Sequence, residues 1–217
     1  GELSGTIDGI LRHAISKLSH LHLVANEDAA RRVEQLGEHP DTVWAIGSPD
    51  VDVMVSDQLP ELDEVLADYE IPFRDYVLVI LHGVTTKPPA AVRAMARALV
   101  DALLGSGRSA VVVYPNNDAG SSAILEEYDR LADQRRFRIF PSVRFEAFLT
   151  LLRHAQMMIG NSSAGIREAP IYGIPSVNIG GRQRDRHHHE GIVSCGTSVD
   201  EIRSAIERAG HMQLSEP

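Results

Sequence analysis

The chain has 217 residues, a formal net charge of −9 and 43% hydrophobic residues, enough apolar material for one substantial core or two smaller ones. The acidic balance argues against a nucleic-acid partner, because binding a phosphate backbone relies on clustered Lys and Arg. No apolar run reaches the roughly 18 residues of a membrane span, so we expect no membrane partner. The single cysteine, Cys195, excludes a disulfide framework and fits a reducing cytoplasm, where we expect it to be a packing residue.

The first part of the chain alternates helix-like and strand-like patterns. The sequence IDGILRHAISKLS predicts a helix whose buried side consists of Ile7, Ile10, Leu11, Ala14, Ile15 and Leu18. Asn26 is a plausible N-cap for a second helix, which Gly37 would end. In chain order the patterns predict a helix over 7–19, a strand over 20–25, a helix over 26–37 and a strand over 42–47. The acidic stretch 48–75 holds three prolines and one expected helix around 60–69, and we interpret it as a domain junction.

A second series begins with DYVLVILHG at 75–83, whose continuous apolar character is typical of a strand buried on both faces. The alternation that follows predicts an α/β fold with mostly parallel strands and a complete nucleotide-binding type of domain. The expected helices cover 88–105, 121–133, 144–154, 163–172 and 198–209, and the expected strands cover 109–115, 137–141, 156–160 and 175–180.

Polar residues follow several of these strands at the point where each strand ends. In an open parallel sheet, ligands bind at the carboxyl ends of the strands, where the loops converge. The informative residues should therefore lie directly after strands. Those that do are His82, Asn116, Asp118, Asn161, Ser162, Ser163 and Arg182.

The turn IGNSSAG is the most suggestive of these positions. A helix that begins near Ser162 leaves its first backbone N–H groups unpaired and carries partial positive charge there, which makes a cradle for a diphosphate. The hydroxyls of Ser162 and Ser163 add donors, and Gly160 and Gly165 allow the backbone to approach a ligand closely. On the residues alone, plain N-capping followed by an exposed Glu168 explains the pattern equally well.

Four segments resemble, in order, the successive motifs of the hydrolysing UDP-N-acetylglucosamine 2-epimerases: GELSGTIDGILRHAISKLSH, LHGVTTKP, YPNNDAGS and IGNSSAGIREAPIYGIPSVNIGGRQ. Members of that family release UDP and N-acetylmannosamine in the sialic-acid pathway. The resemblance implies a GT-B-like architecture of two Rossmann-like domains with parallel sheets, the first incomplete. Residues 1–66 would be a remnant of the N-terminal domain plus the junction, and residues 67–217 the C-terminal nucleotide-binding domain.

The resemblance also implies roles for individual residues. Asp8 and His82 would be catalytic, whereas the residues alone favour an N-cap role for Asp8 and an ordinary strand-end histidine for His82. Ser162 and Ser163 would hold the diphosphate, and Glu168 would bind the ribose hydroxyls. The full set of expected UDP-binding residues is Asn116, Val143, Ser162, Ser163, Glu168 and Arg182, with Arg182 and His82 near the phosphates.

The expected molecule is a cytoplasmic homo-oligomer that binds a UDP-sugar and uses no cofactor and no metal. The run RDRHHHEG at 184–191 carries good zinc ligands, but adjacent histidines on one loop rarely meet at one ion, so we interpret it as a loop near the nucleotide. Two alternatives stay open. A GT-B glycosyltransferase would share the phosphate-binding turn but has no reason to carry the GTID segment, and a noncatalytic UDP-sugar-binding fragment would bind without turnover.

Overall fold

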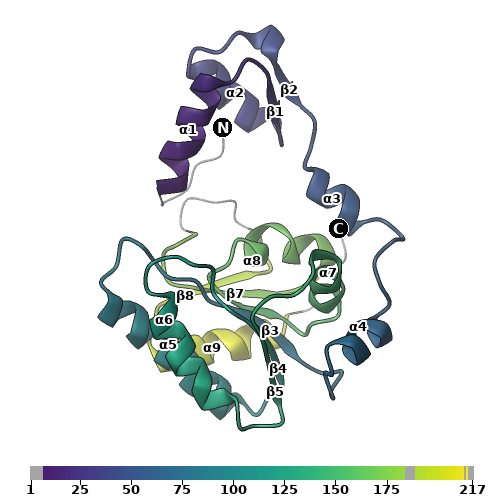
Figure 1. Cartoon of the computed structure of the whole chain (residues 1–217), viewed down its shortest axis with the longest axis vertical. Coiled ribbons are helices and arrows are strands. Elements are labelled where there is room, and N and C mark those ends of the chain that lie inside the picture. The colour runs from purple at the N-terminus through teal and green to yellow at the C-terminus, as the bar shows by residue number, and fades with distance from the viewer. Residues whose placement is uncertain (1–6, 184–188, 213, 215–217) are drawn as a thin grey trace. The chain divides into compact units, whose positions relative to one another are not determined.

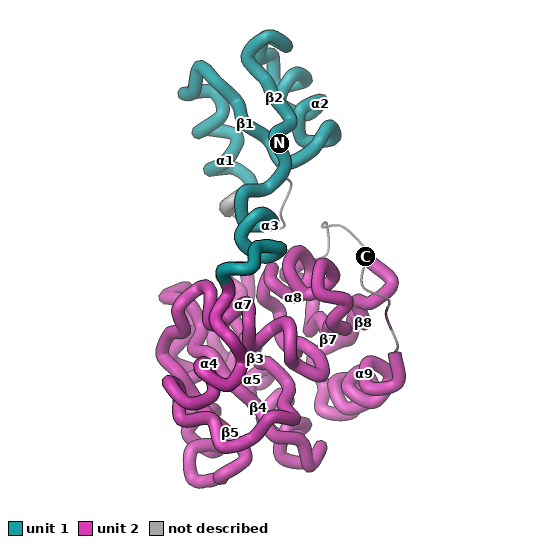
Figure 2. Tube along the Cα trace, turned by 90° about the vertical axis from the view of Figure 1, so that its right-hand side faces the viewer, with its two compact units in different colours: residues 1–58, 184–186 teal, residues 59–183, 187–217 magenta. Residues whose placement is uncertain are grey.

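The computed structural model of the chain describes residues 7–183, 189–212 and 214. The described residues divide after Gln58 into two compact units (Figure 2). This division lies earlier in the chain than the boundary expected after residue 66, because helix α4 (Leu62–Asp68) packs against α7 (Phe145–Arg153) of the second unit. Within the described ranges, no helix combines the length and the apolar character that crossing a bilayer requires.

In its described residues, the first unit contains a two-stranded parallel sheet accompanied by helices (Figure 1). The N-cap prediction is confirmed, since the side chain of Asn26 accepts a hydrogen bond of 2.9 Å from the amide of Ala29. Gly37 follows the second helix with a φ of 92°, a conformation that favours glycine. The elements of the first unit are α1 (Ile7–Leu18), β1 (His22–Val24), α2 (Glu27–Gln35), the 3₁₀ turn η1 (Pro40–Thr42), β2 (Val43–Ala45) and α3 (Pro49–Met54). The sequence did not predict α3, whose first residue is a proline.

The prediction that α1 buries its apolar side is wrong for the described residues. Ile10 is 72% exposed and Leu18 is 83% exposed, because no described element covers that side of the helix. One face of the two-stranded sheet is open as well, where Leu23 and its register partner Trp44 are 64% and 44% exposed. The opposite face is covered by α2, which buries Val33.

The second unit is built on a six-stranded sheet in which every neighbouring pair is parallel. This confirms the predicted α/β class. The strand order β5-β4-β3-β6-β7-β8 is the doubly wound order of dinucleotide-binding domains, with β3 as the first strand of the unit. The elements that follow α4 are β3 (Val77–Ile80), α5 (Pro89–Ser106), β4 (Ala110–Val113), α6 (Ser121–Tyr128), η2 (Asp129–Leu131), β5 (Phe137–Phe140), α7, β6 (Met158–Gly160), α8 (Ala164–Arg167), η3 (Ala169–Tyr172), β7 (Ser176–Ile179), β8 (Ile192–Cys195) and α9 (Val199–Gly210).

Two details differ from the sequence prediction. The expected helix over 163–172 is broken at Glu168 into α8 and η3, because Pro170 has no amide hydrogen to continue the α-helical pattern. Strand β8 was not predicted, and it pairs with β7 at the edge of the sheet.

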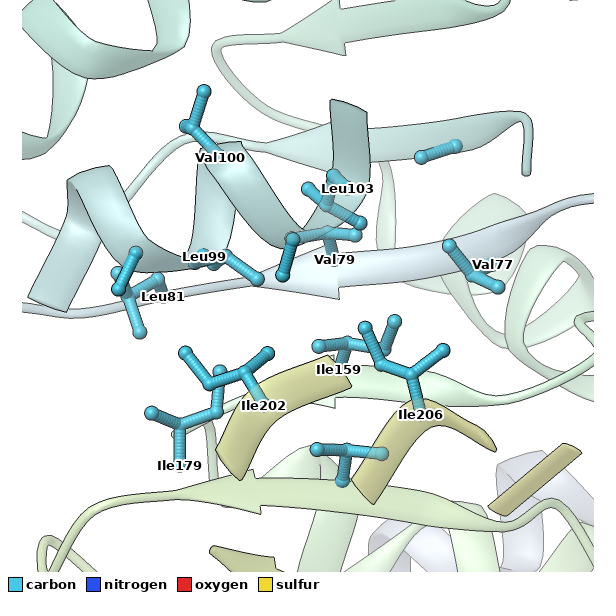
Figure 3. Packing of buried hydrophobic residues seen from close by; sticks show 14 of the residues in the cluster. Val77, Val79, Leu81, Leu99, Val100, Leu103, Ile159, Ile179, Ile202 and Ile206 are labelled. Atoms are coloured by element: carbon cyan, nitrogen blue, oxygen red, sulfur yellow. The ribbon is translucent and has the colours of Figure 1, made fainter. Parts of the chain in front are cut away.

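Hydrophobic layers cover both faces of this sheet. Successive strand residues point to opposite faces, so Val77 and Val79 pack with α5 and α9, as Figure 3 shows. Leu78 and Ile80 pack instead with α4 and α7. Each fully buried side chain of this kind contributes about 1.5–3 kcal/mol relative to an exposed one, so the two layers fix the sheet and the loops at its ends.

The strand order reverses between β3 and β6, which are hydrogen-bonded neighbours. The chain leaves β3 toward α5 on one face of the sheet, and it leaves β6 toward α8 on the other. Loops that diverge in this way leave a crevice outside the carboxyl ends of the two strands, which is where doubly wound domains bind their ligands. Residues 81–83 and 161–163 stand at this point.

Candidate functional site

Gly160 allows the two strand ends to lie this close. It stands opposite Ile80 in the register of β3 and β6, with a φ of 143°. A Cβ atom on Gly160 would overlap the carbonyl carbon and oxygen of Ile80, and those atoms belong to a central strand that cannot yield. Glycine is therefore required here, and it brings the loop after β6 directly beside the loop after β3.

Asn161 joins the two loops through its side chain. Its Oδ1 accepts a 2.7 Å hydrogen bond from the amide of His82, and its Nδ2 donates a 2.9 Å hydrogen bond to the carbonyl of the same residue. The carbonyl oxygen of Asn161 accepts from Nε2 of Gln183 at 2.8 Å and from Nη1 of Arg182 at 3.3 Å. Asn161 is fully buried, so four of its hydrogen bonds are shielded from water.

The imidazole of His82 is held in its neutral form. The amide of Asn116 donates to Nδ1 of His82 at 3.1 Å. Burial and, to a smaller extent, the positive charge of Arg182 together lower the pKa of His82 to about 4, and the charge of Asp118 and a hydrogen bond with the side chain of Asn116 oppose them. Asp118 also accepts a 2.7 Å hydrogen bond from Nδ2 of Asn116 and lies 3.8 Å from Nη2 of Arg182.

The serine turn offers unused donors. In the described part of the chain, the amides of Ser162 and Ser163 donate to no acceptor, whereas the amides of Ile166 and Arg167 both donate to the carbonyl of Ser163. The hydroxyl oxygen of Ser162 accepts from the amide of Ala164 at 3.3 Å. Because α8 has only four residues, attraction for an anion at this turn comes from the local N–H groups rather than from a long helix dipole.

A small cavity of about 10 Å³ lies behind the serine turn, between β6, β7 and α8, with Ser162 in its lining. Ser176 and Asn178 reach it from β7, and both are more than nine-tenths buried. Oγ of Ser176 and Oδ1 of Asn178 have no hydrogen-bond partner in the structure. The cavity can hold one water molecule, and its two orphan groups are suitable partners for one.

The described contacts join some of the predicted site residues directly. Hydrogen bonds and charges link His82, Asn116 and Arg182, and the serine pair follows Asn161 directly. Glu168 lies between α8 and η3, and Val143 precedes α7, where it packs against the layer formed by α4 and α7. Asp8 is in the first turn of α1, in the first unit.

Two further functional candidates emerge from the structure. Asn161 was expected only as a strand-end residue, and Gln183 was not expected at all, although it is 96% buried by the same turn. Both could have been found from the sequence, because Asn161 precedes Ser162 and Gln183 follows Arg182. Residues 184–188 of the RDRHHHEG run lie outside the described residues, and within the described ranges no group of three His, Cys, Asp or Glu side chains is arranged to hold a metal ion.

Comparison with known proteins shows the family of the chain. A family model described as UDP-N-acetylglucosamine 2-epimerase matches residues 1–216. The chain is 48% identical over 209 residues to the UDP-N-acetylglucosamine 2-epimerase of Neisseria meningitidis serogroup B, a match that covers 96% of this chain and 55% of that protein. It is 30% identical over 210 residues to a UDP-N,N′-diacetylbacillosamine 2-epimerase (hydrolyzing) of Legionella pneumophila, again over 96% of this chain and 55% of that protein.

Solved structures give the same fold. The crystal structure of the UDP-GlcNAc 2-epimerase of Methanocaldococcus jannaschii in complex with UDP-GlcNAc and UDP superimposes with a TM-score of 0.74 and 15% identity, covering 99% of this chain and 62% of that one. At that identity the likeness concerns the fold alone. The chain spans about half the length of the curated relatives that it matches.

Proposed function

The chain belongs to the UDP-N-acetylglucosamine 2-epimerase family, and from that premise we propose that it provides the nucleotide-binding part of a hydrolysing UDP-N-acetylglucosamine 2-epimerase. The complete reaction would release UDP and N-acetylmannosamine. We further propose that the working enzyme is a cytoplasmic homo-oligomer in the supply of N-acetylmannosamine for sialic acid, and that the two units, which divide after Gln58 rather than after residue 66, belong to the two Rossmann-like domains of the family.

One observation carries the proposal. The amides of Ser162 and Ser163, which have no acceptor among the described residues, lie at the point where the strand order of the sheet reverses, in the same loop cluster as His82 and Arg182. In an otherwise acidic chain, the described residues place neutral donors and the guanidinium of Arg182 where a doubly wound domain binds phosphate. A UDP diphosphate would receive hydrogen bonds from the serine turn and charge from Arg182.

The remaining site residues would act on other parts of the substrate. We assign Glu168 to the ribose hydroxyls, Asn116 and Val143 to the nucleotide, and Asp8 to a proton-transfer role. In the proposed elimination, a base removes the C2 proton, the electron pair forms the C1–C2 double bond, and the C1–O bond breaks toward UDP. Water then adds its oxygen to C1, and a proton returns to C2 from the opposite face, which inverts that carbon. The groups around the diphosphate stabilise the negative charge that UDP acquires as it leaves.

Calorimetric titration of the full chain with UDP tests the nucleotide site. Because a hydrogen bond to a charged group contributes about 1.5–3 kcal/mol, Ser163→Ala is expected to weaken UDP binding by roughly ten- to a hundredfold. Arg182→Met is expected to weaken it at least as much. Ser176→Ala is the matched control, since Ser176 is a buried serine of β7 whose Oγ has no hydrogen-bond partner among the described residues. Equal affinity in Ser163→Ala and Ser176→Ala would contradict the assignment.

Turnover separates the epimerase from the alternatives. The chain is incubated with UDP-N-acetylglucosamine, and the products are followed by NMR. Release of UDP together with N-acetylmannosamine supports the epimerase. Transfer of the sugar to an added acceptor would favour a GT-B glycosyltransferase, and UDP binding without turnover would favour a noncatalytic binding fragment.

A further inference from the structure

The hydrogen bond from Asn116 to His82 fixes where the imidazole carries its proton. A backbone N–H can only donate, so Nδ1 of His82, which receives the amide of Asn116 at 3.1 Å, must be the unprotonated nitrogen. A neutral imidazole with a bare Nδ1 carries its hydrogen on Nε2. With Nδ1 occupied as an acceptor, Nε2–H is the nitrogen through which the neutral ring can donate.

The position of the ring depends on a second residue. Asn161 contacts both peptide groups of His82, accepting from its amide and donating to its carbonyl. The side-chain oxygen and nitrogen of Asn161 cannot exchange these roles, because the amide of His82 can only donate and its carbonyl can only accept. Since Asn161 belongs to the loop after β6 and His82 to the loop after β3, this pair of bonds holds the histidine at a fixed place beside the serine turn.

We propose that His82 works as a neutral hydrogen-bond donor through Nε2–H, and that Asn161 is the positioning residue that holds it for this task. An N–H donor beside Arg182 suits an oxygen that gains negative charge, such as the phosphoryl oxygen that leaves C1 of a UDP-sugar. The donor keeps its proton while the bond strengthens, so no proton is transferred. The residue that takes the C2 proton would then be a group other than His82.

Charge and burial around the ring favour this role. Among the described residues, the charged groups that act on His82 are Arg182 and Asp118, and they shift its protonation in opposite directions. Burial dominates both and keeps the pKa of His82 at about 4, so the imidazole stays neutral at any pH near 7. A neutral ring is also a poor candidate for a general acid that must give up a proton completely at neutral pH.

Nitrogen NMR of the imidazole tests the tautomer in the wild-type chain without any ligand. The expected result is a protonated Nε2 and an unprotonated Nδ1 for His82, unchanged between about pH 6 and pH 8, where an ordinary histidine titrates. A proton on Nδ1, an even mixture of the two tautomers, or titration within that range would overturn the proposal.

Two substitutions test Asn161. Asn161→Asp keeps the shape and the acceptor for the amide of His82 but loses the donor to its carbonyl, and Asn161→Ala loses both. Both variants are expected to give mixed His82 tautomers and a pKa raised toward that of a solvent-exposed histidine, because the ring is no longer held in its buried place. Ser176→Ala, a buried control in the same sheet, is expected to keep the wild-type tautomer. An unchanged tautomer and pKa in folded Asn161→Ala would remove the positioning role.

The donor role rests on the proposed UDP site, and UDP titration keeps the two ideas apart. UDP added to the wild-type chain is expected to shift the Nε2–H resonance of His82 while the proton stays on Nε2. If UDP fails to bind but the tautomer is as expected, the proposed function fails and the arrangement of His82 and Asn161 stands. If UDP binds and the proton is found on Nδ1, the donor role fails and the nucleotide site stands.

Discussion

Gly160 offers the sharpest test of how the fold creates the site. Replacing it with alanine places a methyl group on the carbonyl of Ile80, which belongs to the backbone of a central strand. The φ of 143° adds a second cost, since L-residues rarely adopt it. The overlap between the methyl group and Ile80 can be relieved only if β3 and β6 separate. Their separation would also move the serine turn that follows Gly160.

The size of the effect follows from these two terms. A non-glycine residue in a sparsely populated backbone region costs about 1–3 kcal/mol, and forcing extra volume into a packed interior costs about 1–3 kcal/mol more. We therefore expect Gly160→Ala to lower the free energy of unfolding by roughly 2–6 kcal/mol. Gly107→Ala is the matched control, because Gly107 has a φ of 71° but open space around its Cβ position, so it should pay the backbone term alone.

The assay is urea unfolding of both variants, followed by circular dichroism. Fluorescence of Trp44, the single tryptophan, would report on the first unit rather than on the sheet that holds Gly160. Gly107 is the C-cap of α5 and precedes β4, so it lies at the amino ends of the strands, whereas the candidate site lies at their carboxyl ends. Only Gly160→Ala should therefore also weaken UDP binding. Equal stability losses in the two variants would refute the steric part of the argument, and unchanged UDP affinity in folded Gly160→Ala would refute the link to the site.

Further predictions concern the charges at the site and the open face of the first unit. Asp118→Asn is expected to lower the pKa of His82 and Arg182→Ala to raise it, as measured by NMR titration, because each change removes one of two opposing charges. Between about pH 6.5 and pH 4 the unfolded chain binds a proton at His82 and the folded chain does not, so acidification should reduce the free energy of unfolding. The share of this reduction that is due to His82 should disappear in His82→Gln. Leu23→Lys and Trp44→Lys should change stability by less than about 0.5 kcal/mol and reduce self-association seen by light scattering, because both side chains are exposed.

Local sequence patterns predict most of the fold. Alternating apolar runs located five of the six strands of the large sheet, and the cap at Asn26 was predicted because an N-cap acts within four residues. The apolar side of α1 could not be placed in the same way. Periodicity shows that a helix has an apolar side, but it carries no information on which element, if any, covers that side.

The candidate site could be predicted only in outline. Ser162, Asn116 and His82 were expected because each follows a strand, and parallel strands end at one edge of a sheet. The bonds between Asn161 and His82 join residues 79 positions apart, and no local pattern specifies such a pairing. The neutral state of His82 depends in turn on its burial, which residues distant in the sequence create. It is therefore a property of the tertiary structure rather than of any motif.

The same contacts explain how a chain with a net charge of −9 could attract a diphosphate. Among the residues that the structure describes, Arg182 is the cation that acts on His82, and Asp118, 3.8 Å from its Nη2, offsets part of its charge. What the site has instead is a set of neutral donors whose directions are fixed before any ligand arrives: two amides, a serine hydroxyl and an imidazole N–H. Such donors gain strength in a site shielded from water and need no reorganisation as charge develops on a leaving oxygen. Their directions are set by Gly160 and Asn161, so these two residues control the site although neither needs to touch the substrate.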